Sequence, residues 1–355
     1  MLHGSEKPIK LCPSSLKVIL CIHPTLKIGD EAMACKTKKP KKKHLKSSKY
    51  RVRNWPKYNN SLKQRGGILI WIDPRCDWLY QGLRKPGGKI IYSDLAIEMF
   101  LQVRQIFHIA LRQSEGFITD IMTMLNLDLP VPNYSVVSRR AKTLEIELER
   151  YSKKDKSEPK GTTYMIIDST GLKVYGEGEW ANVKHGTKIR RDWRKLHVSV
   201  NEKGYIQAVE LTDRHTDDAS QVDNLHKKSG EKVDVTIADG AYDATEVYSN
   251  FISDNKDTVI IIPPRKSAIL SDETVLFQRN EHIEYIRDKG RDEWEKQSGY
   301  AKQSRAENTM FRYKATFGDK LHARLFESQK NESILSCSIL NKMASLGMPD
   351  SYKVA

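Results

Sequence analysis

Residues 164–170 read Tyr-Met-Ile-Ile-Asp-Ser-Thr, an apolar run that ends in the carboxylate of Asp168. A second run of the same kind, residues 233–240, reads Val-Asp-Val-Thr-Ile-Ala-Asp-Gly and ends at Asp239. A short apolar run bounded by polar residues and glycine is typical of a buried strand. We therefore predict two strands that each deliver a carboxylate at or near one end.

A third acid, Glu307, lies in residues 298–317, which have the pattern of a long helix. Two strand carboxylates and one helix carboxylate can converge on hard divalent cations, because such ions prefer oxygen ligands. We expect Mg²⁺ (or Mn²⁺) with two ions in the site, Asp168 bridging both and Asp239 and Glu307 each completing one. Two such ions are the arrangement needed to cut and join phosphodiesters.

The pattern around these acids predicts a mixed α/β domain. Strands come first, followed by a helix, a strand, a helix, a strand and the long helix. This order is that of a ribonuclease-H-like mixed sheet flanked by helices. The expected strands are 163–168, 171–176, 194–200, 205–211, 233–238 and 258–262; the expected helices are 217–228, 244–253, 298–317 and 331–345.

Four regions follow from composition and periodicity. Residues 1–66 are an unpatterned extension and a basic arm, which we expect to be largely disordered. Residues 67–151 are a helical, helix-turn-helix-like DNA-binding region, although the same three-helix pattern also suits a plain helical subdomain packed on the core. Residues 162–326 are the ribonuclease-H-like catalytic domain, with a small, charged, loop-like insertion at about 267–292. Residues 327–355 form a C-terminal helix and tail.

The helical region has its own local signals. Ser93 is the expected N-cap of the first of the three helices. The third helix, from about Ser135, carries Arg139 and Arg140, which are candidate DNA contacts.

The positive charge of the chain is concentrated in one segment. The 355 residues carry a formal charge of +15, and residues 34–66 contain Lys and Arg but no Asp or Glu. A basic block of this density predicts an arm that binds a polyanion such as DNA, although a solvated tail or an import signal has the same composition. The arm contacts that we expect are Lys38, Lys39, Lys41, Lys42 and Lys43.

The remaining composition favours a soluble cytoplasmic protein. Five cysteines are scattered without CxxC spacing, which suits a reducing compartment and indicates no zinc site. The longest early apolar run is residues 18–22, too short for a membrane span, and we expect no contact with a membrane.

Four blocks in order resemble the DDE transposases of bacterial insertion sequences, in the insertion-sequence-five branch of the insertion-sequence-four superfamily. The blocks are residues 167–173, residues 176–197, residues 238–243 and residues 300–314, and the likeness spans about 164–326. The resemblance implies a magnesium-dependent enzyme whose catalytic and metal-binding residues are Asp168, Asp239 and Glu307. It also implies binding to the terminal inverted repeats of a transposable element, cleavage of the 3′ ends and their transfer to target DNA in DNA recombination.

The signature on the last helix of that family is Tyr, two residues, Arg, three residues, Glu, six residues, Lys. Tyr300, Glu307 and Lys314 match it, but Gln303 stands at the Arg position. A continuous helix would put Gln303 about one turn before Glu307, in the same groove, and we expect it to contact DNA with Tyr300 and Lys314. Arg305, two residues further on, would face away.

A basic loop in the second block adds further candidates. We expect Lys184, Arg190, Arg191 and Arg194 to contact the DNA backbone beside the active site. His197 lies in an alternating strand and is interpreted as a packed or surface histidine. Asp213, Asp217 and Asp218 are interpreted as the start of the helix at 217.

The partners implied are double-stranded element ends and target DNA, with a homodimer or larger synaptic complex to hold two ends, in a cytoplasmic, nucleoid-associated protein of bacteria. Two alternatives remain open. One is a nuclease of the same fold without strand transfer, and the other is an inactive DNA-binding descendant, which Gln303 favours slightly and the intact acid triad opposes.

Overall fold

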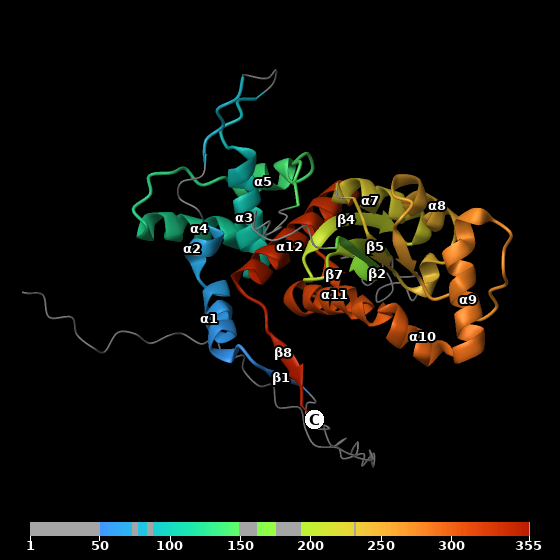
Figure 1. Ribbon diagram of the computed structural model, residues 1–355. Coiled ribbons are helices and arrows are strands. Elements are labelled where there is room, and N and C mark those ends of the chain that lie inside the picture. Colours follow the sequence, from blue (N-terminus) through green and yellow to red (C-terminus); the bar gives the residue numbers. More distant parts are fainter. Residues whose placement is uncertain are drawn as a thin grey trace, which may run out of the picture. The chain divides into compact units, whose positions relative to one another are not determined.

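The computed structural model describes residues 50–72, 77–83, 88–148, 162–174, 193–230 and 232–354. In this part of the chain a mixed sheet has the strand order β4-β3-β2-β5-β6, and β7 also pairs with β2 (Figure 1). β2 is antiparallel to β3 and parallel to β5 and β7. The bounds are β2 Tyr164–Val174, β3 Trp193–Val200, β4 Ile206–Asp213, β5 Val235–Ile237, β6 Val259–Ile261 and β7 Lys320–Leu321.

Helices cover both faces of this sheet. Alternate residues of a strand point to opposite faces, so an apolar run such as residues 164–168 fits a strand that is buried on both sides. Ile166 and Leu172 belong to the core formed with α11 and α12, whereas Met165 and Ile167 belong to the core formed with α7 and α8. The bounds are α7 Val222–Ser229, α8 Thr245–Asp254, α11 Ser304–Phe317 and α12 Phe326–Leu346. This mixed α/β architecture is compatible with a ribonuclease-H-like fold.

One edge of β2 is only partly paired. β3 runs along one side of β2, from Ile166 to Lys173. On the other side β5 pairs only as far as Ile166, and β7 begins only at Lys173. Among the described strands, the middle of β2 therefore has no neighbour on that side, and Asp168 lies in this gap.

The helices before the sheet share its hydrophobic core. Ile97, Phe100 and Val103 of α3 are fully buried and lie in the same cluster as Leu196 of β3 and Leu335 of α12. The bounds are β1 Tyr50–Val52, α1 Trp55–Arg65, α2 Ile68–Trp71, α3 Asp94–Ile106, α4 Leu111–Met124 and α5 Tyr134–Arg140. The N-cap prediction for Ser93 is confirmed, because its side chain accepts from the Ala96 N–H at 3.0 Å.

Several expected boundaries are wrong. Residues 50–66 were expected to belong to a disordered arm, but β1 pairs with the C-terminal strand β8 (Ser351–Lys353) and α1 follows it. The strands expected at 163–168 and 171–176 form the single strand β2 as far as Val174. The loop-like insertion at 267–292 contains the short 3-10 helix η3 (Thr274–Leu276), the helix α9 (Phe277–Lys289) and the start of α10. The C-terminal helix expected at 331–345 is confirmed within the longer α12.

The long helix expected over 298–317 is broken near its start. α10 (Arg291–Ser298) ends at Gly299, whose φ of 80° is left-handed. Glycine adopts this conformation without a steric penalty, so it ends the helix and redirects the chain. A 3-10 turn, η4 (Tyr300–Gln303), follows, and α11 begins only at Ser304. The break changes the direction in which residues 300–303 point.

None of the helices in the described ranges is both long enough and apolar enough to cross a membrane.

Candidate active site

Asp168 lies in the part of β2 that has no neighbouring strand on the β5 side among the described residues. It lies on the same face as Ile166, the face covered by α11, because side chains two apart in a strand point the same way. Its carboxylate is half-buried, and the N–H of Ser169 donates to it at 2.8 Å. Asp168 is thus held at the edge of the core rather than at a free loop end.

Asp239 immediately follows the neighbouring parallel strand, after Ala238 extends β5. Its carboxylate accepts from the Ala241 N–H at 2.9 Å and caps the 3-10 turn η2 (Gly240–Tyr242). Close packing favours glycine at position 240, because the Cβ of any other residue would lie 3.2 Å from the carbonyl oxygen of Pro263. Because β2 and β5 are parallel neighbours, Asp168 and Asp239 emerge at the same end of the strand pair.

Glu307 comes from the first turn of α11. Ala306 and Met310 of that helix are buried against the sheet, whereas Glu307 is exposed at the edge of this packed face. A carboxylate in the first turn is also favoured by the helix dipole.

The electrostatics show that these acids form one group. Burial raises the pKa of Asp168 from 3.8 to about 6; the Ser169 N–H lowers it, and the charges of Asp239, Glu307 and Asp218 raise it. Each of these carboxylates therefore disfavours charge on Asp168. Asp218 is thus a fourth carboxylate that acts on this site. The sequence analysis interpreted it only as part of the start of a helix.

The pKa values of a buried and a half-buried tyrosine are raised by the same carboxylates. The pKa of Tyr242 is raised by burial and then by Asp218, Asp168 and Asp239. Burial, Asp239 and Glu307 together raise the pKa of Tyr300 to about 12. Tyr300 therefore lies near the acid group, as expected, and its ring packs on Trp294 with centroids 5.6 Å apart.

The chemistry of the donors fits a hard divalent cation. Carboxylate oxygens suit such an ion, and clustered negative charge is stabilised when a cation binds. Within the described residues, however, no three His, Cys, Asp or Glu side chains approach closely enough to hold a metal ion between them. The carboxylates are thus coupled electrostatically but do not form a closed ligand cage.

Gln303 is placed differently from the expectation. Its side chain is 3% exposed, and its Nε2 donates to the backbone oxygen of Ile167 at 2.9 Å. The β2–β5 ladder ends one residue earlier, so this amide satisfies a strand carbonyl beside Asp168. Its Oε1 is buried without a partner among the described atoms. The prediction that Gln303 contacts DNA is therefore wrong, because the side chain points into the core.

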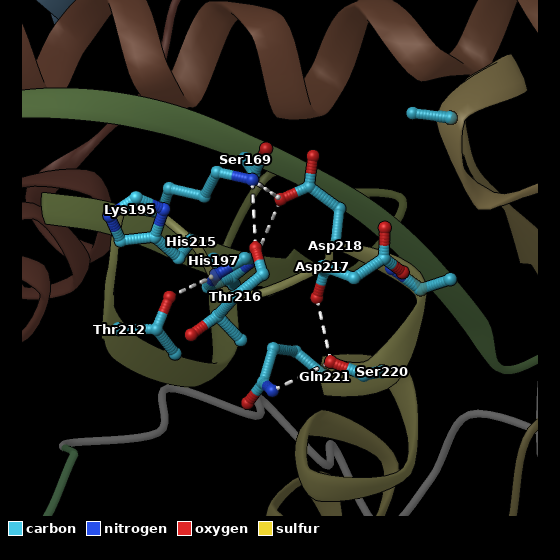
Figure 2. A network of polar contacts seen from close by, with 12 residues as sticks. Ser169, Lys195, His197, Thr212, His215, Thr216, Asp217, Asp218, Ser220 and Gln221 are labelled. Carbon is cyan, nitrogen blue, oxygen red and sulfur yellow. Dashed lines mark hydrogen bonds and ion pairs between the residues drawn. The ribbon is translucent and has the colours of Figure 1, made fainter.

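A polar network joins β3 to the segment that follows β4, and the sequence analysis did not predict it. Lys195 Nζ donates to Thr216 O at 2.8 Å and to Asp218 at 3.2 Å (Figure 2). His197 is fully buried, with Nε2 2.8 Å from Thr212 Oγ1, which confirms that it is a packed histidine. The alternation of β3, in which residues 195 and 197 share a face, was the available signal. The network fixes the position of Asp218, whose charge also raises the pKa of Asp168.

Two protein-family models match this chain. Both are described as a transposase DDE domain; one matches residues 63–177 and the other residues 159–342. The second model alone spans more than half of the chain. This chain belongs to the DDE transposase family. The match supports an enzyme that acts on DNA, and the three carboxylates lie within the matched region in the order that the family name describes.

The expected DNA contacts of this transposase have mixed placements. Lys314 and Arg139 are exposed, on α11 and in the last turn of α5. Arg140 donates to Tyr92 O at 3.1 Å and pairs with Asp94, and Arg194 donates to Gln329 at 3.2 Å. Arg140 and Arg194 are thus engaged in internal contacts, and their binding to DNA stays a prediction. The remaining candidates lie outside the described residues: Lys38, Lys39, Lys41, Lys42, Lys43, Lys184, Arg190 and Arg191.

Removing the charge of Asp168 should stabilise the transposase at high pH. The folded-state pKa is raised from 3.8 to about 6, so the folded state binds the proton more tightly. The stability from this group is present below pH 3.8 and is lost as the pH rises through about 6. At pH 8 we expect Asp168→Asn to raise the free energy of unfolding by on the order of 1–2 kcal/mol after allowing for solvent screening, and at about pH 3.5 much less.

Urea unfolding at the two pH values measures this difference. Asp217→Asn, at an exposed neighbouring acid, is the matched control and should be nearly neutral. An equal gain from Asp168→Asn at both pH values would contradict the electrostatic explanation.

Proposed function

We propose that this transposase mobilises a bacterial insertion sequence of the insertion-sequence-five branch. It binds the terminal inverted repeats of its element, cuts the 3′ ends and joins them to target DNA. The observation that carries the proposal is the electrostatic coupling of Asp168, Asp239 and Glu307, which come from a strand, the end of its parallel neighbour and a helix. The family match and the sequence blocks around each acid support the same assignment.

The catalytic unit is a ribonuclease-H-like domain at about 162–326. The strand order and the helices on both faces support this assignment. The helical region at 67–151 acts as the DNA-binding part, supported by the exposed Arg139 in the last turn of α5.

Asp168, Asp239 and Glu307 would hold the two Mg²⁺ or Mn²⁺ ions that this chemistry uses. Bound there, the ions would activate the attacking oxygen and neutralise the leaving oxygen of the phosphodiester. The raised pKa of Asp168 supports this role, because a cation offsets the burial and the repulsion that disfavour its charged form. The three carboxylates would have to move closer to one another when DNA and metal bind, so that they can share the ions.

The other residues of the site position the DNA strand. Lys314 lies seven residues after Glu307 on α11, about two turns along the same face, and contacts a phosphate. Tyr300 lies beside the acids and lines the path of the strand. Two element ends must be held together, so the active form is a homodimer or a larger synaptic complex.

The direct test incubates the purified protein with labelled element ends and Mg²⁺. Nicking at the 3′ ends, followed by joining to a target plasmid, is the expected result. Ca²⁺ should support binding without cutting. Nicking without any joined product would instead identify a nuclease, and binding without either reaction would identify an inactive descendant.

Neutralising the basic arm should weaken binding to all DNA sequences alike. Lys38, Lys39 and Lys41 with their neighbours Lys42 and Lys43 form a dense positive block. Replacing all five by Gln should lower the slope of log affinity against log salt by about 0.9 for each phosphate that the arm no longer neutralises. Fluorescence anisotropy with specific and scrambled duplexes at several salt concentrations measures this change. An unchanged slope would show that the arm does not touch DNA.

A further inference from the structure

A cavity of about 360 Å³ lies between α3, the C-terminal part of α11, β7 and α12. Its polar lining is Arg104, Gln105, His108, Lys320, His322 and Glu332. None of these residues belongs to the acid group, and none was selected by the sequence motifs. The cavity therefore needs an explanation of its own.

Arg104 lacks the partners that a half-buried arginine requires. Its Nε is fully buried and has no hydrogen-bond acceptor, and the guanidinium makes no ion pair with any residue that the structure describes. Guanidinium carries five donors and keeps its charge, so leaving it unpaired beside the core is costly. Arg140 of α5, by contrast, pairs with a carboxylate.

The one carboxylate that lines the described part of the cavity makes no ion pair with Arg104 and is bonded elsewhere. Glu332 is buried and accepts from the His322 N–H at 2.9 Å and from the Ala323 N–H at 2.7 Å. Its second role is to hold His322, whose Nδ1 lies 3.2 Å from Glu332 Oε1. The carboxylate is thus used to shape the wall of the cavity.

Positive charge surrounds the unpaired guanidinium. Lys320 of β7 is exposed at the cavity, whereas its register neighbour Lys173 is paired with Asp319 and adds no net charge. Ala110, which also lines the cavity, is the N-cap of α4, so the positive end of that helix dipole adds to the field. A cavity with a free guanidinium, a lysine and two imidazoles matches the chemistry of an anion with several oxygens.

We propose that this cavity binds a phosphate group, which Arg104 and Lys320 grip, at a site separate from the catalytic acids. The inference rests on the proposed function in one respect, since the backbone of bound DNA is the phosphate source that a transposase meets. Free phosphate offers the same chemistry, and the experiment separates the two sources. The site would anchor DNA against the junction of α3 and α4.

The test compares the full-length protein with Arg104→Gln and Lys320→Gln, using Lys289→Gln as the control. Lys289 is an exposed lysine on α9, outside the cavity. Thermal unfolding is recorded with and without inorganic phosphate, at equal ionic strength set with chloride. Phosphate should raise the melting temperature of the wild type and of Lys289→Gln. The phosphate affinity of the two cavity variants should be weaker by about 10- to 100-fold, the loss of one or two charge-assisted hydrogen bonds.

The same variants have a second readout that a merely structural arginine would not produce. Without phosphate, Arg104→Gln should unfold at the same temperature as the wild type or higher, because an unpaired charge is removed. Arg104→Gln should also lower the salt slope for duplex binding by about 0.9, as expected when one phosphate is no longer neutralised. If duplex DNA displaces phosphate, the source is the DNA backbone; if it does not, the source is free phosphate.

Two results together would overturn the inference: phosphate stabilises the variants as much as the wild type, and the salt slope for duplex binding is unchanged. Neither measurement requires cleavage. A protein that binds phosphate through Arg104 but never cuts DNA would refute the proposed function and leave this site standing.

Discussion

Asp168→Ala should bind element ends with unchanged affinity and cut them about 10³-fold more slowly or worse. The proposed role of this carboxylate is to hold both metal ions, and the ions supply several kcal/mol of transition-state stabilisation. DNA affinity should persist, because most of it comes from phosphate contacts made elsewhere. Asp168 is half-buried and accepts from the adjacent Ser169 N–H at 2.8 Å, a local bond, so its removal should not unfold the domain.

Gel-shift binding and single-turnover nicking of labelled ends, each in Mg²⁺, measure the two effects separately. Asp239→Ala and Glu307→Ala should behave in the same way. Asp217→Asn, at an exposed acid of the neighbouring loop, is the matched control and should cut at the wild-type rate. Nicking by Asp168→Ala at the wild-type rate would refute the assignment of the acid group.

Gln303→Arg should destabilise the protein by about 1–3 kcal/mol, the cost of forcing a longer side chain into a packed, buried position. Sequence alone placed Gln303 in the groove that contacts DNA, where an arginine would be expected to gain a phosphate contact. The structure reverses this expectation because the side chain is 3% exposed and its amide is bonded to Ile167 O. An arginine would lose the bond to Ile167 O and would have to fit a longer, charged side chain into this packed position.

Urea unfolding of three variants tests this placement. Gln303→Met keeps the volume but loses the bond to Ile167, and it should cost about 1–2 kcal/mol. Arg305→Gln, at an exposed position two residues away, should fall within about 0.5 kcal/mol of the wild type. A Gln303→Arg protein that is as stable as the wild type and binds DNA more tightly would restore the original interpretation of the helix face.

Much of the catalytic fold could be predicted because its signals are local. The apolar runs that end at Asp168 and Asp239 need no distant partner to be recognised as strands, and β2 and β5 are where those runs lie. The predicted secondary structure was wrong where the local sequence signals disagree with one another. Residues 298–317 are rich in helix formers throughout, yet Gly299 breaks the run with a left-handed φ of 80°. Residues 267–292 were interpreted as a loop from their charge, yet α9 is a helix with few buried positions.

Residue types and local periodicity were enough to identify the candidate acids, the order of the strands and helices that carry them, and the kind of chemistry that they suit. These depend on residue type and on periodicities of two or about 3.6 residues, which are visible in a single chain. Only the tertiary structure decided which polar side chains are free. Gln303 meets Ile167 across 136 residues, Arg140 meets Asp94 across 46, and Asp218 lies beside the acids through Lys195. Burial and pairing are properties of the assembled core, so the same arginine or glutamine can be a DNA contact, a structural tie or an unpaired charge that lines a cavity.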